Sequence, residues 1–217
     1  MLTVPAHSCA GFSDINICYN TVMKNRDLSI DEPVVQNGDP VLRKKASAVA
    51  PELIGGKTLQ GEIQKMKDVL KYEYDGVAIA APQLGYSRRL FVVSGRVFQE
   101  KPNDPMEPDM VCINPEIIKT SSKTTLLDEG CLSVRYHYGQ VKRHLQVTIQ
   151  YIDENGISRV RGAGGFLAHV IQHEIDHLEG ILFIDKAHNL EVLSGKDKKQ
   201  LDRQRQNHIE QLQKHGK

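Results

Sequence analysis

Residues 165–180, which read GFLAHVIQHEIDHLEG, are the stretch of sequence that decides the fold. Its apolar side chains recur every three or four residues from Phe166 to Leu178, a spacing that places them on one face of an α-helix. Gly180 follows at a position where helices commonly end. The segment 166–179 is so apolar that we expect a buried helix.

The predicted helix also contains a candidate metal site. Residues 173–177 read HEIDH and match the pattern H-E-x-x-H, which places His173 and His177 one turn apart on one helix face, within reach of a single metal ion. Glu174 lies beside them and can accept a proton from water. Five residues can match this pattern by chance in a surface helix. Two histidines and a carboxylate on a mostly apolar helix are costly to bury without a cation, however, and this favours a metal site.

The helix alone does not decide the identity of a third ligand. His169 lies one turn earlier, but a helical turn rises about 5.4 Å and a metal–nitrogen bond is about 2 Å, so three successive turns do not comfortably reach one ion. We therefore expect His169 to be packed or to act from beyond the ligands. The metzincin pattern has a third histidine where this chain has Phe183, and the later acids Glu191 and Glu210 lie in polar sequence.

Cys131, far upstream of the helix, is a further candidate ligand. It lies in residues 129–133, which read EGCLS. A thiolate and two imidazoles make a three-ligand site with an open fourth position, the arrangement that a hydrolytic metal needs. Taken alone, a cysteine is more often a small buried apolar residue.

The middle of the chain is predicted to be mostly antiparallel β structure. Apolar residues at helical spacing in 59–72 indicate one helix before it. Strand patterns follow at residues 90–93 and 145–151 and, more weakly, at 111–113 and 116–118, and residues 153–156 supply a hairpin turn. A sheet-rich body followed by one buried helix indicates the α+β class.

The composition is that of a soluble globular protein. The chain has 217 residues, of which 40% are hydrophobic and 25% charged, values that fit one domain with tails. Lys and Arg number 28 against 27 Asp and Glu, so the net charge of +1 provides no overall attraction to DNA or to an acidic membrane. The sequence shows no secretory signal, no long apolar run and no CxxC pair, and we therefore expect a cytoplasmic protein with reduced thiols.

Three segments together resemble the ordered motifs of the peptide deformylase family. They read GVAIAAPQLG at residues 76–85, EGCLS at 129–133 and QHEIDH at 172–177, and three motifs in order are far more specific than one. GDPVLR at 38–43 and GILFID at 180–185 extend the resemblance. It implies an α+β fold in which antiparallel β-sheets surround the buried helix that carries the metal-binding motif. It also implies an enzyme that removes the N-formyl group from the formyl-methionine end of newly made proteins, releasing formate.

The resemblance assigns roles to individual residues. The metal ligands that it implies are Cys131, His173 and His177, holding one divalent ion that is Fe(II) in the cell and replaceable by zinc, nickel or cobalt. It implies that Glu174 is the base, and that the Gln83 side-chain amide and the Leu132 backbone N–H donate to the oxygen that becomes negative. The residues expected to bind substrate are Gly76, Val77, Ala78 and Gly130.

The resemblance also suggests the domain organisation. It covers about residues 36–187, which we take as the catalytic domain, preceded by an N-terminal extension over residues 1–35. Residues 188–217 form a polar tail rich in Lys, Arg and Gln, which we expect to be a solvated helix or a frayed end. Its clustered basic residues also raise the hypothesis that the tail docks on the ribosome surface, near the nascent chain.

This chain departs from the family pattern at two places beside the cleft. The second glycine of the first motif is Ala78 here. Residues 134–139, which read VRYHYG, follow the second motif where many relatives carry a proline or a small polar residue next to the valine. Neither departure touches a ligand or the base, so the sequence supports the reaction type better than the preference for substrate side chains.

Two other functions fit parts of the sequence. An H-E-x-x-H metallopeptidase would cut internal amide bonds with a similar water, although Phe183 argues against its best-known form. A catalytically silent relative would keep the metal for folding and bind ribosomes through its tail. Turnover of peptides with and without the formyl group distinguishes all three.

Overall fold

A computed structural model of the chain describes residues 34–99 and 105–215. Almost all of the predicted extension over residues 1–35 lies outside the described residues. The side chains described end at residue 214. Within the described part, no helix has the length and apolar character needed to cross a membrane.

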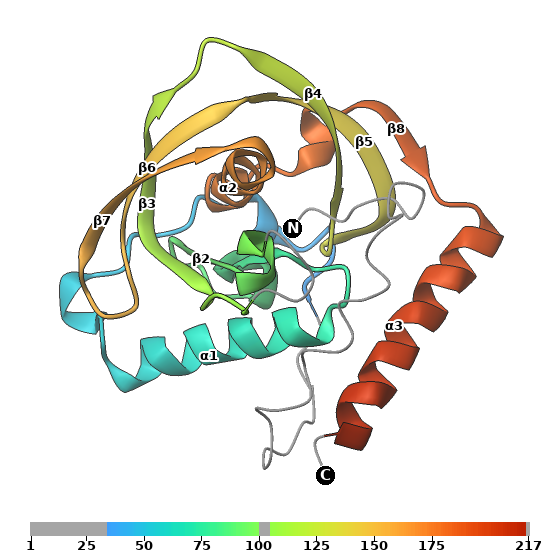
Figure 1. The fold of residues 1–217 in the computed structure, drawn as a ribbon, viewed down its shortest axis with the longest axis horizontal. Helices are drawn as coiled ribbons and strands as arrows, with labels where there is room; N and C mark the ends of the chain where they lie inside the picture. Colours follow the sequence, from blue (N-terminus) through green and yellow to red (C-terminus); the bar gives the residue numbers. More distant parts are fainter. Residues whose placement is uncertain (1–33, 100–104, 216–217) are drawn as a thin grey trace.

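In the described part of the chain, two antiparallel sheets and three α-helices make up the fold (Figure 1). The larger sheet has the strand order β1-β2-β3-β6-β7, with bounds Ala78–Ala80, Leu90–Val93, Met110–Thr120, Gln146–Ile152 and Ser158–Gly164. The smaller sheet has the order β4-β5-β8, with bounds Thr124–Cys131, Val134–His144 and His188–Val192. The helices are α1 (Lys57–Tyr72), α2 (Gly165–Leu178) and α3 (Gly195–His215). The α+β class is confirmed.

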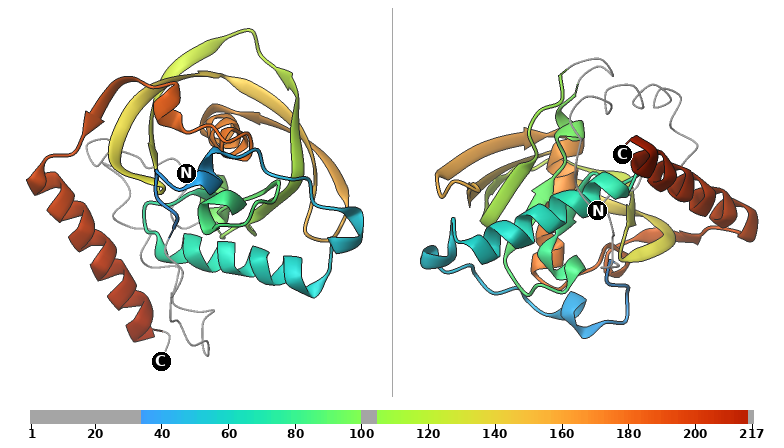
Figure 2. Two further views of the ribbon diagram at one scale, coloured as in Figure 1. Left: turned by 180° about the vertical axis from the view of Figure 1, so that it is seen from behind. Right: turned by 90° about the horizontal axis from the view of Figure 1, so that it is seen from below.

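Helix α2 lies at the centre of the molecule. Figure 1 looks almost along its axis and shows strands of both sheets curving around it, and the views in Figure 2 agree. Ten of its residues are buried, including both histidines of the H-E-x-x-H motif. The helix ends before Gly180, whose φ of +75° suits glycine. Glycine is also needed there because a Cβ would lie only 2.7 Å from the Arg43 carbonyl oxygen.

Strands β1 and β2 separate two parts of the hydrophobic core. Ile79 and Val92 pack with α1, which supplies Leu59, Ile63, Met66, Val69 and Leu70. Ala78 and Ala80 lie on the opposite face and pack in the cluster that contains residues of α2. This alternation is the ordinary two-residue period of a strand, here buried on both faces. It places α1 and α2 on opposite sides of β1.

The predicted strands are present, with one difference. Segments 111–113 and 116–118 belong to one strand, β3, whose pairing with β6 shifts register between Ile113 and Glu116. Asn114, at the shift, has a φ of +50°. A bulge of this kind interrupts the alternation of apolar residues, which explains why the sequence pattern showed two short segments. The turn predicted at 153–156 connects β6 to β7.

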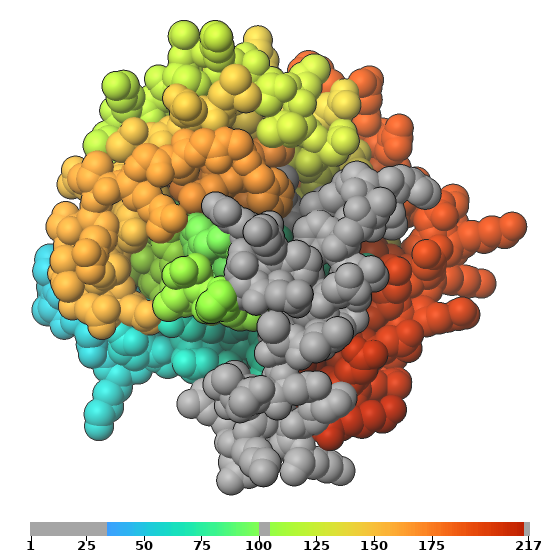
Figure 3. Space-filling model, in the orientation of Figure 1, coloured from blue at the N-terminus to red at the C-terminus, as the bar shows by residue number. Residues whose placement is uncertain are grey.

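The polar tail begins with a strand and continues as a helix. Strand β8 pairs with β5, so residues 188–192 belong to the smaller sheet. Helix α3 follows and lies as a separate ridge beside the body, with long side chains projecting outward (Figure 3). Its inward stripe is half-buried and has helical spacing, comprising Leu201, Arg205, His208, Ile209 and Leu212.

Candidate metal centre

The structure brings Cys131, His173 and His177 together. Cys131 ends strand β4, and the two histidines lie one turn apart on α2. One possible ligand atom from each side chain lies within 4.8 Å of the other two. The three residues are buried, with exposures of 3%, 1% and 1%. Two segments more than forty residues apart therefore converge on one buried point suited to a single ion.

The hydrogen bonds of His173 orient it as a ligand. Its Nδ1 lies 2.7 Å from Oε2 of Glu129, so Nδ1 carries the proton and donates to the carboxylate. The lone pair is then on Nε2, which is buried and has no hydrogen-bond partner among the described residues. Nε2 of His177 lies 3.3 Å from the Cys131 sulfur. A buried acceptor facing a cysteine and a second imidazole fits a divalent ion.

The environment of Cys131 favours its thiolate form. Burial alone would raise the pKa of this thiol, but its pKa lies well below the usual value, and the imidazoles of His177 and His173 are among the groups that lower it. The thiolate is the form that binds metals. The donor set is thus one soft sulfur and two imidazole nitrogens, which Fe(II), zinc, nickel and cobalt all accept.

Glu129 is the centre of the polar network behind the ligands. Its carboxylate accepts from Arg143 at 2.7 and 3.0 Å, from His169 Nε2 at 2.5 Å and from His173 Nδ1 at 2.7 Å. Burial alone would raise the pKa of Glu129, but the bonds from His169, His173 and Arg143 hold it far below its usual range. The buried carboxylate therefore stays ionised and stabilises the orientation of His173.

A second acid completes the network. Asp176 on α2 accepts from Arg143 at 2.6 Å and from the Lys186 ammonium at 2.7 and 2.8 Å. Arg143 thus bridges Glu129 and Asp176, and connects strand β5 to both β4 and α2. Every charge in this buried group has an opposite charge beside it, which offsets the cost of removing it from water.

Sequence reasoning assigned no role to Glu129 or Arg143. Glu129 was visible in the second motif, and because alternate residues of a strand share a face, its position two before Cys131 was a signal that it lies on the same side. Arg143 had no local signal, because its two partners lie 14 and 33 residues away along the chain. His169 was expected either to be packed or to act from beyond the ligands, and it contacts Glu129.

Of the predicted catalytic side chains, Gln83 contacts Cys131, and Glu174 lies next to His173 along α2. Glu174 is fully buried on α2, directly after His173. Gln83 lies in a short 3₁₀ turn, Ala81–Leu84, that follows β1. Its Oε1 accepts from the Ala80 backbone at 2.9 Å, which directs Nε2 toward Ser133 Oγ at 3.2 Å and the Cys131 sulfur at 3.6 Å. Gln83 can therefore donate beside the metal centre.

Leu132 and Gly130, on either side of Cys131, are also in place. Both are buried. The Leu132 carbonyl accepts from the Gln36 side chain at 2.9 Å. Gly130 lies opposite Tyr138 in the pairing of β4 with β5. The structure thus holds the second motif as the end of a strand and a tight turn beside the metal ligands.

Strand β1 presents an edge beside this centre. Within the described residues, β1 pairs only with β2. The Ser94 N–H donates to the Val77 carbonyl at 2.8 Å, which makes Ala78 and Val93 a pair without hydrogen bonds between them. The backbone N–H and C=O of Ala78 therefore point away from β2. Ala78 as a whole is buried, with an exposed fraction of 0%, and it packs in the cluster that contains residues of α2.

The sequence of this chain is similar to those of known proteins. A sequence model described as "Polypeptide deformylase" matches residues 31–192. The peptide deformylase of Rhizobium meliloti is 36% identical over 157 residues, which cover 71% of this chain and 83% of the relative. That of Synechocystis is 37% identical over 166 residues, covering 75% and 82%.

Solved structures show the same likeness. One is a class I type b peptide deformylase from Acinetobacter baumannii with Met-Ala-Ser bound, which has 36% identity and a TM-score of 0.64 and covers 71% of this chain and 96% of that one. Another is a peptide deformylase from Synechococcus elongatus in complex with actinonin, which has 34% identity and a TM-score of 0.67 and covers 84% and 92%.

Proposed function

Because the chain belongs to the peptide deformylase family, we propose that Cys131, His173 and His177 hold one divalent ion and that Glu174 is the catalytic base. The enzyme removes the N-formyl group from nascent peptides. The observation that carries the proposed site is the buried Nε2 of His173, which faces a cysteine and a second imidazole and is held there by Glu129.

The side chains around the centre divide the work of hydrolysis. When bound, a divalent ion lowers the pKa of a water molecule and polarises a carbonyl. Glu174 accepts the proton of the attacking water. The Gln83 amide and the Leu132 N–H donate to the formyl oxygen as it becomes negative. Glu174 then passes the proton to the departing amine, leaving formate and a free amino terminus.

The edge of β1 that has no partner strand among the described residues is the proposed binding surface for the peptide. An extended peptide would add to this edge as a further strand, using the outward N–H and C=O of Ala78. Gly76 and Val77 precede Ala78 along the chain, and Gly130 lies on strand β4, next to Cys131. The Arg96 guanidinium holds the carbonyls of Leu70, Tyr74 and Gly76, and so connects the approach to β1 with the end of α1.

The proposal also covers the identity of the ion, the location in the cell, the extent of the catalytic domain and a contact with the ribosome. Fe(II) is the proposed ion in the cell, with zinc, nickel or cobalt as replacements, because a thiolate and two imidazoles bind all four. The proposed location is the cytoplasm, where nascent formylated chains are made, and residues 36–187 are the proposed catalytic domain. Exposed basic side chains of α3 such as Lys196 and Lys199 are the proposed contact with the ribosome surface.

The proposed function is tested with formylated and unformylated peptides. The chain, prepared anaerobically with Fe(II) or with Ni(II), should release formate from formyl-Met-Ala-Ser and should leave Met-Ala-Ser and internal amide bonds intact. The Cys131→Ala variant should bind no stoichiometric metal and should release no formate. Cleavage of internal bonds would favour the metallopeptidase, and a metal-loaded chain that releases no formate would favour the silent relative.

A further inference from the structure

Helix α3 contacts two segments near the N-terminal end of β1. One is the segment between α1 and β1, and the other is the start of β5. Arg205 on α3 donates to Glu73 at 2.8 and 2.9 Å, and Arg135, which lies just after the second motif, donates to the same carboxylate at 2.8 Å. Glu73 follows α1, and its side chain is only 3% exposed. One buried carboxylate therefore joins α3, the start of β5 and the segment that leads into β1.

Tyr136 provides a second attachment. Its backbone φ is +66°, a conformation that a bulky residue rarely adopts. The hydroxyl donates to Asp202 on α3 at 2.7 Å, the Lys198 ammonium lies 4.3 Å from the ring centroid, and the Tyr136 carbonyl accepts from Leu193 at 2.8 Å. These contacts hold residues 134–139, the segment that differs from the family pattern, in one arrangement against the tail. Tyr74, one residue after Glu73, donates to Gln204 of the same helix at 3.0 Å.

The position of Gln83 indicates at which end of β1 the formyl group of the peptide lies. Gln83 lies in the turn that follows Ala80, the last residue of β1, and its Nε2 is 3.6 Å from the Cys131 sulfur. The formyl group therefore belongs at the C-terminal end of β1. A peptide paired with β1 would then extend back past Gly76 toward Glu73. At about 3.3 Å per residue, its first three or four residues cover the edge, and the residues beyond them reach α3.

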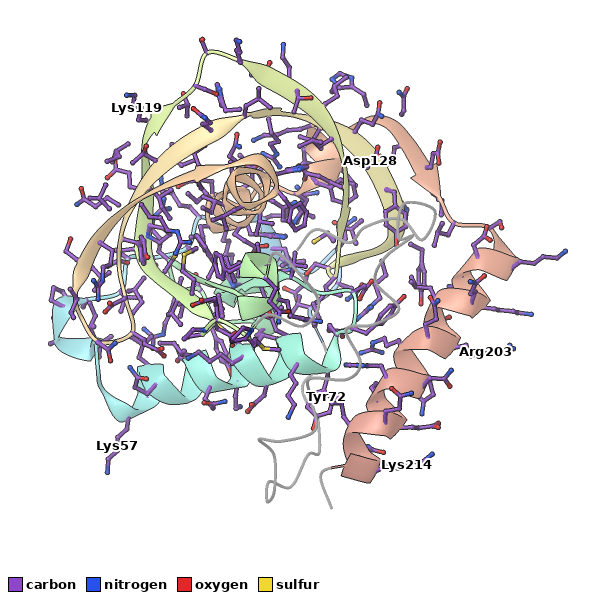
Figure 4. The ribbon with its side chains drawn as sticks, in the orientation of Figure 1. Lys57, Tyr72, Lys119, Asp128, Arg203 and Lys214 are labelled. Carbon is purple, nitrogen blue, oxygen red and sulfur yellow. The ribbon has the colours of Figure 1, made fainter. Side chains whose placement is uncertain are left out.

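We propose that α3 positions the exit end of the peptide groove through the carboxylate of Glu73, and thereby sets the affinity for residues beyond the fourth of a nascent chain. This rests on the proposed function, because it takes the peptide to lie along β1. Arg205 is a positioning residue in this proposal and takes no part in the reaction. Figure 4 shows α3 approaching the body near Tyr72, at the end of α1, while Arg203 on the same helix points away from it.

The packing of α3 makes these polar contacts important. Among residues 195–214, whose side chains the structure describes, none is buried. Apolar burial therefore contributes little to holding the helix, and loss of Arg205 would leave Arg135 as the one ion-pair partner of Glu73 among the described residues. Because elements with few buried contacts open locally at low cost, the helix should loosen without unfolding the body.

The test compares Arg205→Gln with Arg203→Gln on peptides of two lengths, formyl-Met-Ala and formyl-Met followed by five alanines. For the long peptide, Arg205→Gln should raise KM by about threefold to fivefold, the effect of losing one partly exposed ion pair. For the short peptide, KM should stay within the error of the wild type. The kcat on both peptides and the metal content should not change. Arg203→Gln is the matched control, since it removes the same charge from the outer face, and should change neither KM.

An equal rise in KM for both lengths, or none for the long peptide, would overturn the proposal. Tyr136→Phe offers a second variant that removes only the hydroxyl bond to Asp202 and should show the same length dependence, so the test does not depend on the folding of Arg205→Gln. If the wild type released no formate from any formyl peptide, the proposed function would fail. Calorimetric binding of the same two peptides would then decide the inference, because Arg205→Gln must weaken only the long one.

Discussion

The residue that organises the centre is Glu129, although it is neither a ligand nor the base. Its two oxygens accept four bonds from Arg143, His169 and His173. Such partners fix the tautomer and the ring orientation of a metal-binding histidine. The clustering of Cys131, His173 and His177 could be predicted, because the two histidines are one helical turn apart and the cysteine lies in a recognisable motif. Their supporting residues could not, because those contacts depend on how β4, β5 and α2 pack.

His169 tests whether this support matters for the metal. His169→Leu removes one donor from Glu129 and leaves a buried lone pair without a partner. We expect the metal to be bound about tenfold to a hundredfold more weakly, the usual effect of losing a residue that orients a ligand. His169→Gln, which can still donate, should restore most of the affinity. Competition with a chelator measures both variants, and an affinity of His169→Leu equal to that of the wild type would rule out the positioning role.

Among the elements, β1 shows most clearly what the sequence could and could not predict. Taken alone, the first motif favours a glycine-containing buried turn over a strand beside a cleft. Its role as an edge strand depends on the pairing of Ala78 with Val93, and therefore on the register of β2. In the same way, helix α3 could be expected from its length and composition, whereas the bond between Arg205 and Glu73 joins residues 132 positions apart.

The edge of β1 predicts an alternating effect of substrate N-methylation. In an antiparallel pair, alternate residues of each strand point their N–H groups toward the partner. Methylating the amide that pairs with Ala78 should therefore raise KM by about twofold to tenfold, the effect of one lost hydrogen bond, and methylating its neighbour should have little effect. A scan of singly methylated formyl peptides measures this pattern. Equal effects at adjacent amides would argue against strand addition at β1.

On the scale of the whole molecule, the two sheets of the described residues curve around α2 and enclose the candidate metal centre, and β1 lies at one end of the larger sheet. The fold class followed from the change between strand and helix periods, since the pattern of α2 spans more than three turns. The arrangement of the sheets did not, because the order β1-β2-β3-β6-β7 places together strands that are distant in sequence. Charges buried between these elements also affect the stability of the whole chain.

Asp75 provides a test of that effect. Burial, and then the neighbouring Glu73, raise the pKa of Asp75 from 3.8 to about 6. The folded state therefore holds a proton that the unfolded state releases between these two pH values, and ionised Asp75 opposes folding above pH 6. Asp75→Asn should raise the free energy of unfolding at pH 7.5 by roughly 1–3 kcal/mol and should give no gain at pH 3.5 or below.

Urea unfolding at several pH values measures the change. The gain should develop as the pH rises from 3.8 to about 6 and should stay constant above that. Asp128→Asn, at an exposed position on β4, is the control and should show no such dependence. A gain at pH 7.5 that persisted unchanged at pH 3.5 would mean that the pKa of Asp75 is not its cause.

The measurement that tests the central claim most directly is the metal content and the formate release of Glu174→Gln, made side by side with the wild type. The amide keeps the shape of the side chain but cannot accept the proton of water. The variant should bind one ion per chain, as the wild type does, and release formate from formyl-Met-Ala-Ser at least about a hundredfold more slowly. Formate release within a few-fold of the wild type, at equal metal content, would contradict the account of Glu174 as the base of a Cys131, His173 and His177 centre.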